Sequence, residues 1–357
     1  MAFSLDILKN EYDSEFFFTS DRQCIEYLLL ENLDFLEEYA LLVTEAEAWL
    51  FTPHSVECKE VKQVMYEGYS DRNYQDKAGN ILKKLDEFSL PTQGGTAFEK
   101  LRYADYFRNR GCALKDLTQQ VLKKAGVKTP GQWKAIENCV EITENCYRAI
   151  ADKKVSDESE ISLFRYVQES IVESTGYNNR MIYDFLAGKR TGEVSGHPTL
   201  YRIKEKDTLI ADLLPRHRGV YADMTRTFFA GTPTDKQVYI YEVLCEAILA
   251  GEQVLRPGAD SREIYEAVYT VFKKYGIEGN FVHHAGHGLG MGYYEAPWFL
   301  KEQSELILEN MVVALEPGLY FKGEFGIRIE NNYRITENGA KRLGTLPLEM
   351  ETYILKM

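Results

Sequence analysis

The stretch Phe281-Val-His-His-Ala-Gly-His-Gly-Leu-Gly-Met-Gly holds three of the six histidines of the chain within five residues. Glycines flank His287 on both sides. A glycine has no side chain to keep the backbone away from a ligand, and it loses more conformational entropy on folding than other residues do. We therefore interpret His287 as a binding residue in a site that the backbone approaches closely. A purely structural loop is the competing interpretation of this stretch alone.

Two aspartates lie N-terminal to this stretch, in strand-like segments. Asp212 ends the apolar run Asp207-Thr-Leu-Ile-Ala-Asp, and Asp223 follows eleven residues later. The intervening Pro215-Arg-His-Arg-Gly can turn a hairpin. Two aspartates that face each other across a hairpin can bind the same pair of ions, although taken alone they would also fit two ordinary strand ends.

Two glutamates occupy similar positions nearer the C-terminus. Glu316 ends Met311-Val-Val-Ala-Leu-Glu, where an acid is costly unless it is paired or bound to metal. Glu330 lies in Gly326-Ile-Arg-Ile-Glu, and strand alternation puts Arg328 on the same face, so an ion pair between Arg328 and Glu330 is the competing interpretation. Together, four carboxylates and one imidazole suit two divalent cations that share a water, which indicates hydrolytic chemistry.

Length, charge and cysteine content narrow the class of protein. The 357 residues allow two domains, each with its own core. The net charge of −13 argues against a nucleic-acid binder and against docking on anionic membranes. We see neither an apolar run of about 20 residues nor a basic segment followed by an apolar core, so no membrane span and no secretory signal are expected. Six scattered cysteines fit reduced thiols in a cytoplasmic protein.

The chain divides near Val127-Lys-Thr-Pro-Gly, where Thr129, Pro130 and Gln132 form a helix start with a capping box. Residues 1–127 are expected to form an α/β domain, and residues 128–357 are expected to form the second domain of the chain. In the first domain, Tyr39-Ala-Leu-Leu-Val-Thr and Ala48-Trp-Leu-Phe-Thr predict a strand hairpin, with helical patterns around it.

Helix landmarks recur in the second domain. The capping boxes Thr129 with Gln132 and Thr234 with Gln237 lie 105 residues apart, and the helix starts at Asp157, with Glu160 three residues on, and at Asp260, with Glu263, lie 103 residues apart. Each pair of helices is followed by strand-like segments that carry the residues of interest. We therefore predict a duplicated unit of two helices and strands, with a site between two halves that are related by a pseudo-twofold axis.

Together these motifs resemble the pita-bread metallopeptidases, which include aminopeptidase P, prolidase and methionine aminopeptidase. The matching segments are the Asp212 to Asp223 spacing with its Asp-Met-Thr-Arg-Thr tail, His287 in Gly-His-Gly-Leu-Gly, Glu316 in Glu-Pro-Gly, and Glu330 in Arg-Ile-Glu. The resemblance covers residues 128–357 well. It implies an α+β fold, in which a C-terminal pita-bread domain with an internal pseudo-twofold follows a smaller, non-catalytic α/β domain.

The resemblance also implies a role for each ligand. Asp223 and Glu330 would bridge two divalent ions, Asp212 would complete one of them, and His287 with Glu316 the other. The ions would activate a hydroxide, and Glu316 would carry its proton towards the leaving nitrogen. Family members use manganese, cobalt or zinc, and the oxygen-rich ligand set makes manganese the first choice.

Two assisting histidines are also expected from the resemblance. His197 precedes Asp212 by 15 residues, slightly fewer than the family spacing, and we assign it to the first of them. His283, four residues before His287, matches a histidine that lies near the substrate. His284 is the alternative match for that position.

Position 294 departs from the family. It lies seven residues after His287, where a histidine normally donates to the developing oxyanion, but this chain has Tyr294. A tyrosine hydroxyl is also a donor and can supply part of that stabilisation. We expect His283, Tyr294 and Arg328 to contact the substrate. Leu214, where a glycine is usual, is a second departure.

The resulting expectation is a cytoplasmic, metal-dependent exopeptidase that cleaves the N-terminal bond of short Xaa-Pro peptides and forms a homodimer, as similar enzymes commonly do. Methionine aminopeptidases generally lack a long N-terminal domain, and a metal-free creatinase-type hydrolase has no reason to keep all five ligands. The alternative from another class is a catalytically weak or inactive homologue that binds peptides or proteins. Tyr294 is the feature that would support it.

Overall fold

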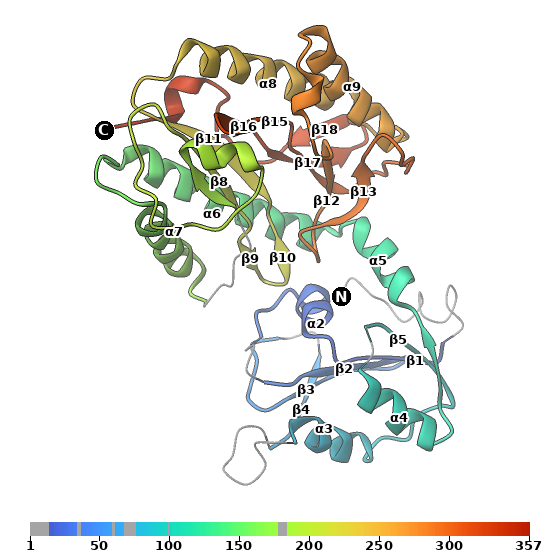
Figure 1. The fold of residues 1–357 in the computed structure, drawn as a ribbon. Helices are drawn as coiled ribbons and strands as arrows, with labels where there is room; N and C mark the ends of the chain where they lie inside the picture. Colours follow the sequence, from blue (N-terminus) through green and yellow to red (C-terminus); the bar gives the residue numbers. More distant parts are fainter. Residues whose placement is uncertain (1–13, 34–36, 59–60, 68–75, 99, 178–183) are drawn as a thin grey trace. The chain divides into compact units, whose positions relative to one another are not determined.

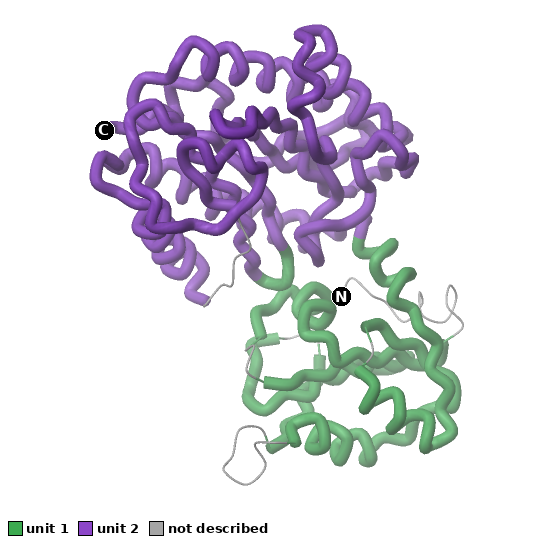
Figure 2. The backbone as a smooth tube through the Cα atoms, in the orientation of Figure 1, with its two compact units in different colours: residues 1–125, 218–220 green, residues 126–217, 221–357 purple. Residues whose placement is uncertain are grey.

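The computed structural model describes residues 14–33, 37–58, 61–67, 76–98, 100–177 and 184–357. The chain forms two compact units, residues 1–125 with 218–220 and residues 126–217 with 221–357 (Figure 2). Residues 218–220, from a turn in the second half of the chain, are thus grouped with the first unit, which the sequence did not indicate.

The first unit contains a mixed six-stranded sheet in the order β4-β3-β2-β1-β5-β6. Its strands are β1 Phe16–Thr19, β2 Ala40–Thr44, β3 Ala48–Thr52, β4 Lys62–Met65, β5 Gln93–Thr96 and β6 Ala113–Asp116. Its helices are α2 Arg22–Leu29, α3 Lys77–Leu85, α4 Leu101–Asn109 and α5 Thr118–Gly126, the last residue of which belongs to the second unit. Strands β2 and β3 pair antiparallel, which confirms the predicted hairpin.

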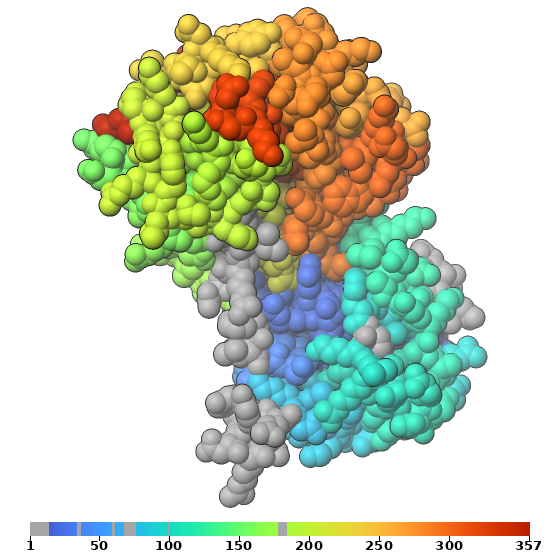
Figure 3. Space-filling view, viewed as in Figure 1, coloured from blue at the N-terminus to red at the C-terminus, as the bar shows by residue number. Residues whose placement is uncertain are grey.

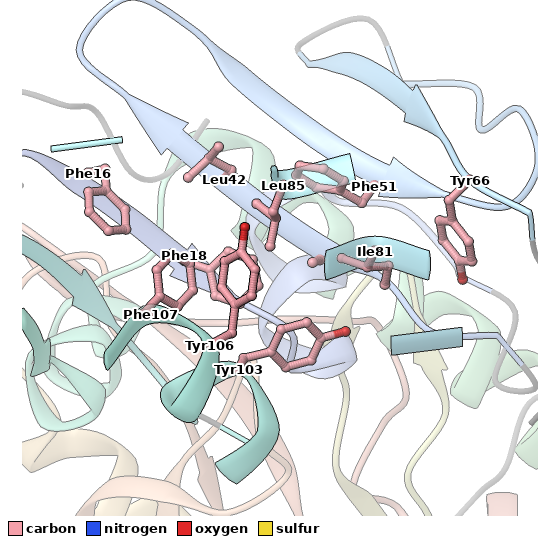
Figure 4. Packing of buried hydrophobic residues seen from close by; sticks show 11 residues of the cluster. Phe16, Phe18, Leu42, Phe51, Tyr66, Ile81, Leu85, Tyr103, Tyr106 and Phe107 are labelled. Atoms are coloured by element: carbon pink, nitrogen blue, oxygen red, sulfur yellow. The ribbon is translucent and has the colours of Figure 1, made fainter. Parts of the chain in front are cut away.

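One face of this sheet packs against α3 and α4. Phe16 and Phe18 are two residues apart on β1 and therefore point to the same face. Their rings lie 5.7 and 5.0 Å from that of Phe107 on α4, centroid to centroid. Ile81 and Leu85, one helical turn apart on α3, complete the cluster (Figure 4). The first unit therefore has a hydrophobic core of its own.

The second unit contains two larger sheets and two short hairpins. One sheet has the order β19-β11-β8-β7, the other β13-β12-β14-β17-β18, and the hairpins are β9–β10 and β15–β16. The strands are β7 Phe185–Ala187, β8 Thr208–Leu213, β9 Arg216–His217, β10 Val220–Tyr221, β11 Met224–Ala230, β12 Gly286–Gly288, β13 Glu295–Phe299, β14 Val312–Leu315, β15 Gly318–Phe321, β16 Phe325–Arg328, β17 Asn331–Thr336, β18 Gly339–Arg342 and β19 Ile354–Leu355. The helices are α6 Pro130–Asp152, α7 Glu160–Thr175, α8 Asp235–Val254 and α9 Ser261–Lys274, with short 3-10 turns η1 Gly188–Glu193, η2 Glu278–Asn280 and η3 Met350–Tyr353.

The order of these elements repeats along the chain. Helices α6 and α7 pack together and precede β7, β8 and β11, and helices α8 and α9 pack together and precede β12 to β18 (Figure 1). Helix α6 contacts β11, whereas α8 contacts β14, β15 and β16. The predicted capping boxes at Thr129, Thr234 and Asp260 are all present. The sequence pattern of two successive helix pairs is therefore confirmed.

The predicted box at Asp157 is wrong. Helix α7 begins at Glu160, and Ser159 with Ser162 forms the capping box instead. The carboxylate of Glu160 is fully buried and accepts hydrogen bonds from the backbone N–H groups of Ala187 (2.7 Å) and Thr199 (2.8 Å). It also pairs with Arg190. The Glu160 side chain is turned into the core, where it connects α7 to β7 and to the loop after η1. It is therefore not available for a capping box, and Ser159 with Ser162 caps the helix.

The hairpin β15–β16 is anchored to η1. The backbone N–H of Gly326 donates to Thr191 Oγ1 (2.7 Å), which in turn contacts Thr208 Oγ1 on β8 at 2.8 Å. An added Cβ at Gly326 would lie 2.2 Å from the Thr191 carbonyl oxygen, so the two backbones meet without room for a side chain. Figure 3 shows the orange-red surface of the hairpin against the yellow-green surface of residues near 190. This contact fixes β16, which carries Arg328.

All six cysteines lie within the described residues, and none of them forms a disulfide there, which agrees with the expectation from their spacing. In the part of the chain that the structure describes, no helix has both the length and the apolar character needed to cross a membrane.

We predict that Glu160→Ala lowers the free energy of unfolding by about 3 kcal/mol, because it leaves the backbone N–H groups of Ala187 and Thr199 without their acceptor and Arg190 without its ion-pair partner. Urea unfolding followed by tryptophan fluorescence or circular dichroism measures this change. The control is Glu169→Ala on the exposed side of α7, which should change stability by less than about 0.5 kcal/mol. Equal effects of the two variants would contradict the anchoring role of Glu160.

Candidate metal centre

Both aspartates stand at the ends of one antiparallel strand pair. Asp212 lies near the end of β8, Asp223 lies directly before β11, and the register pairs Thr225 with Asp212. The short ribbon β9–β10 connects the strands, so the predicted hairpin is present. The side chains of Asp212 and Asp223 are buried.

The other three residues come from the second sheet and its flanks. His287 is the central residue of β12 and lies opposite Ala314 on β14. Glu316 directly follows β14, and Glu330 lies between β16 and β17. Because β14 is bonded to both β12 and β17, these three side chains emerge close together.

The five side chains converge on one buried volume. His287 Nε2 lies 3.6 Å from Asp223 Oδ2 and 3.2 Å from Glu316 Oε1. Ligand atoms of Asp223, His287 and Glu330 all lie within 4.8 Å of one another. Thr225 donates to Glu330 Oε2 at 2.8 Å, which places Glu330 against the strand that pairs with Asp212.

Hydrogen bonding selects the metal-binding tautomer of His287. Its Nδ1 lies 2.9 Å from the carbonyl oxygen of Gly288, which can only accept, so Nδ1 carries the hydrogen. The lone pair is then on Nε2, which faces Asp223 and Glu316. In metal sites, a backbone carbonyl commonly accepts the other ring N–H of a metal-binding histidine and so fixes the orientation of its ring.

Several of these atoms have no hydrogen-bond partner. They are Asp212 Oδ1, His287 Nε2, Glu316 Oε1 and Glu330 Oε1, all buried among the described residues. Buried polar atoms in folded proteins are nearly always satisfied. Four unsatisfied acceptor atoms in one buried cluster fit divalent cations as the missing partners.

The electrostatics of the cluster point the same way. Burial, reinforced by repulsion from neighbouring carboxylates, raises the pKa values of Asp223 and Glu330 well above their usual range. Burial also raises the pKa of Asp212 to about 7, although Arg328 opposes it. Glu316 differs: burial acts to raise its pKa, but the contact with His287 and the nearby imidazoles outweigh it and lower the pKa to about 2. Four carboxylates buried in one volume can all be ionised only when additional positive charge is bound near them.

Arg328 orients Asp212 and is not paired with Glu330. Its Nη2 donates to Asp212 Oδ2 (2.7 Å) and to Asp184 Oδ2 (2.9 Å), and its Nη1 donates to Tyr320 Oη (2.9 Å). The proposed Arg328–Glu330 ion pair is therefore wrong, because the guanidinium turns to the aspartates. With its nitrogens engaged by protein acceptors, a contact between Arg328 and substrate stays a prediction.

Asp184 and Tyr320 were missed from the sequence. Asp184 Oδ1 accepts from Ser195 Oγ (2.7 Å) and from Gly196 N–H (3.0 Å), so this carboxylate links Arg328 to the loop before His197. The available signal for Asp184 was an acid placed directly before the apolar strand β7.

The assisting histidines fall in different places. His283 Nδ1 lies 2.7 Å from the carbonyl oxygen of His284, and His283 Nε2 lies 2.9 Å from Tyr320 Oη, so His283 is neutral and accepts from the tyrosine. Burial lowers the pKa of His283 to about 4. His197 is exposed, and its carbonyl accepts from Arg190 at 2.9 Å. The described structure does not bring the His197 imidazole into either group of metal-ligand-type atoms.

Tyr294 covers His287. The two rings are 4.5 Å apart, centroid to centroid, and nearly perpendicular at 84°. The ring of Trp298 lies 5.5 Å from that of Tyr294. Tyr294 is 50% exposed, so it stands between the buried cluster and solvent, where an incoming ligand would meet it.

A buried ion pair fixes the loop that carries Tyr294. Lys128 Nζ donates to Glu295 Oε2 at 2.8 Å, and the two side chains are 1% and 7% exposed. Glu295 Oε1 accepts from the backbone N–H of Gly292 at 2.7 Å. An added Cβ at Gly290 would lie 2.3 Å from Lys128 Cε, so the loop packs closely over the lysine. This pairing could not be predicted from local patterns, because 167 residues separate its partners.

The fold and the cluster of carboxylates and imidazole agree with the family to which the sequence matches. Residues 134–337 match metallopeptidase family M24, and the chain belongs to this family. The Xaa-Pro dipeptidase of Pyrococcus furiosus is 31% identical over 218 residues, 61% of this chain and 62% of that protein, which is less than two thirds of its length. The Xaa-Pro dipeptidase of Pyrococcus horikoshii is 27% identical over 307 residues, 85% of each chain.

Solved structures show the same fold across the chain. An X-Pro aminopeptidase from Thermotoga maritima superposes with a TM-score of 0.83, at 18% identity, over 98% of both chains. The prolidase from Pyrococcus furiosus gives a TM-score of 0.78, at 23% identity, over 95% of this chain and 99% of that one. The expected pita-bread fold is confirmed.

We predict that Glu295→Ala lowers stability by about 3–5 kcal/mol, because it leaves the Lys128 ammonium buried without its partner. The double variant Lys128→Met with Glu295→Leu should recover most of that loss, since both buried charges are then gone. Thermal unfolding of the two variants beside the parent protein measures the difference. A double variant less stable than Glu295→Ala would contradict the pairing.

Proposed function

We propose that this protein is a metal-dependent exopeptidase that removes the N-terminal residue from short peptides whose second residue is proline. The observation that carries the proposal is the buried cluster of unsatisfied carboxylate and imidazole atoms at Asp212, His287, Glu316 and Glu330. The Xaa-Pro dipeptidases among its relatives supply the substrate class.

Asp212, Asp223, His287, Glu316 and Glu330 would hold two divalent ions, with Asp212 on one side of the centre and His287 and Glu316 on the other. Such ions supply a nucleophilic water and polarise the scissile carbonyl. Carboxylates suit manganese, and cobalt or zinc are the alternatives. Arg328 holds one oxygen of Asp212 in place and leaves the other, Oδ1, without a protein partner.

Side chains at the rim carry the proton and the developing charge. Glu316 Oε1 has no protein partner and faces the reacting volume, so it can accept a proton and pass it to the leaving nitrogen. The Tyr294 hydroxyl donates to the oxyanion from the solvent side. His283, held neutral between Tyr320 and the His284 carbonyl, would line the substrate side, whereas a catalytic role for the exposed His197 stays a prediction.

We further propose that domain 1–127 takes no part in catalysis and that the protein works as a homodimer in the cytoplasm. In the described chain, both groups of metal-ligand-type residues lie in the second unit. Free thiols suit a reducing compartment. The non-catalytic binding module is not favoured, since all five ligand-type residues are kept and the relatives include Xaa-Pro dipeptidases.

The deciding experiment is a panel of Xaa-Pro dipeptides and Xaa-Pro-Yaa tripeptides, with matched Xaa-Ala peptides, assayed after addition of manganese, cobalt or zinc. We expect hydrolysis of the proline peptides and little of the alanine peptides. Asp223→Ala and Glu330→Ala should abolish both metal binding and hydrolysis, because each removes a ligand shared by two ions. Activity retained in either variant would remove the site assignment.

We predict that Tyr294→Phe lowers kcat by up to about 10²-fold and changes KM much less, because a hydroxyl that meets the oxyanion acts in the transition state. Steady-state kinetics on an Xaa-Pro dipeptide test this. The control is Tyr293→Phe, whose ring packs against Tyr221. An unchanged kcat in Tyr294→Phe would make this residue only a wall of the pocket.

A further inference from the structure

A second imidazole stands beside Glu316. His284 Nδ1 lies 3.2 Å from Glu316 Oε1, the same distance as His287 Nε2 from that oxygen. The two rings are 5.4 Å apart, centroid to centroid, and steeply inclined at 77°. The His284 side chain is 18% exposed, so it lies at the inner edge of the site and not on the surface.

Neither contact is a hydrogen bond. His284 Nδ1, His287 Nε2 and Glu316 Oε1 are all buried atoms without a hydrogen-bond partner among the described residues, despite the short separations. Imidazole nitrogens that approach a carboxylate oxygen this closely would normally turn an N–H towards it. In the tautomer of His284 that carries its hydrogen on Nε2, Nδ1 is an acceptor like His287 Nε2. Both nitrogens then lie 3.2 Å from the same carboxylate oxygen, which suits ligands of one cation.

The neighbouring histidine provides the contrast. Ligand-type atoms of His283, His284 and Glu316 lie within 4.8 Å of one another, but both ring nitrogens of His283 have protein partners. His283 Nδ1 donates to the carbonyl of His284 and so helps to fix the backbone there. The ring of Trp298 lies 5.2 Å from His284 and nearly perpendicular to it, which restricts the imidazole further.

We propose that His284 is a sixth ligand residue, which binds through Nδ1 the cation held by His287 and Glu316. The inference rests on the proposed function, since it needs the metal centre. Imidazole nitrogens favour zinc and cobalt over manganese, whereas carboxylates suit manganese. The Glu316 side of the centre, with two imidazoles, therefore selects zinc or cobalt, and the Asp212 side, with oxygen ligands alone, keeps manganese.

The test is competitive binding of Zn²⁺ and of Mn²⁺ against chelators of known affinity, with the stoichiometry of each ion measured by elemental analysis. His284→Ala should weaken zinc binding at one of the two sites by at least about tenfold, the smaller effect seen when even a supporting group of a metal ligand is removed. Manganese affinity should change much less. His284→Gln serves as the larger replacement if the alanine variant unfolds, as judged by thermal unfolding without metal.

The control is His54→Ala in the first unit, which should leave both affinities unchanged. Unchanged zinc affinity in both His284 variants, with two ions still bound, would overturn the ligand assignment while the proposed function stands. Equal weakening of zinc and manganese would overturn it too, because His284 would then act only by holding Glu316. A parent protein that binds neither ion would remove the proposed metal centre and this inference with it.

Discussion

Four carboxylates buried in one volume are the constraint on which the second unit depends. Burial raises the pKa of three of them, Asp212, Asp223 and Glu330, so their shared ionised state is unfavourable in the protein alone. Arg328 offsets part of this at Asp212. The remaining negative charge favours binding of divalent cations and would make folding without them costly, which would link metal binding to stability.

The scaffold holds these charges through side chains bonded to the backbone. Asn332 accepts from the N–H of Asp223 at 3.2 Å and donates to its carbonyl at 2.5 Å, which joins β17 to the start of β11. The fully buried Arg226 donates to the carbonyl of Glu330 at 2.6 Å and to Asn331 Oδ1 at 2.7 Å. Ligands thus lie where strand pairing ends, and polar side chains replace the missing backbone bonds. This fixes the carboxylates before any ion arrives.

Sequence patterns predicted those features that depend on neighbouring residues, such as an acid at the end of an apolar strand or a helix cap. Asp212 and Glu316 were found because an acid closes an apolar strand, and the caps at Thr129 and Thr234 because the capping motif is local. The box at Asp157 and the Arg328–Glu330 pair were wrong for one reason. In both, a charged side chain has local partners that fit, but a distant element offers better-buried ones, and periodicity cannot show which way the side chain turns.

The histidine loop shows how geometry changes an interpretation made from motifs. Tyr294 stands where the family resemblance implies an imidazole, and by itself this suggests a weakened site. In the fold, His284 brings another imidazole to Glu316 from ten residues earlier, while the ring of Tyr294 packs against the rings of both His287 and His284. His284 thus places an imidazole beside Glu316, while the half-exposed Tyr294 places a hydroxyl at the solvent side. If the proposed ligation holds, His284 would act on the ion and Tyr294 on the substrate, so changes at the two positions would alter metal choice and reaction rate separately.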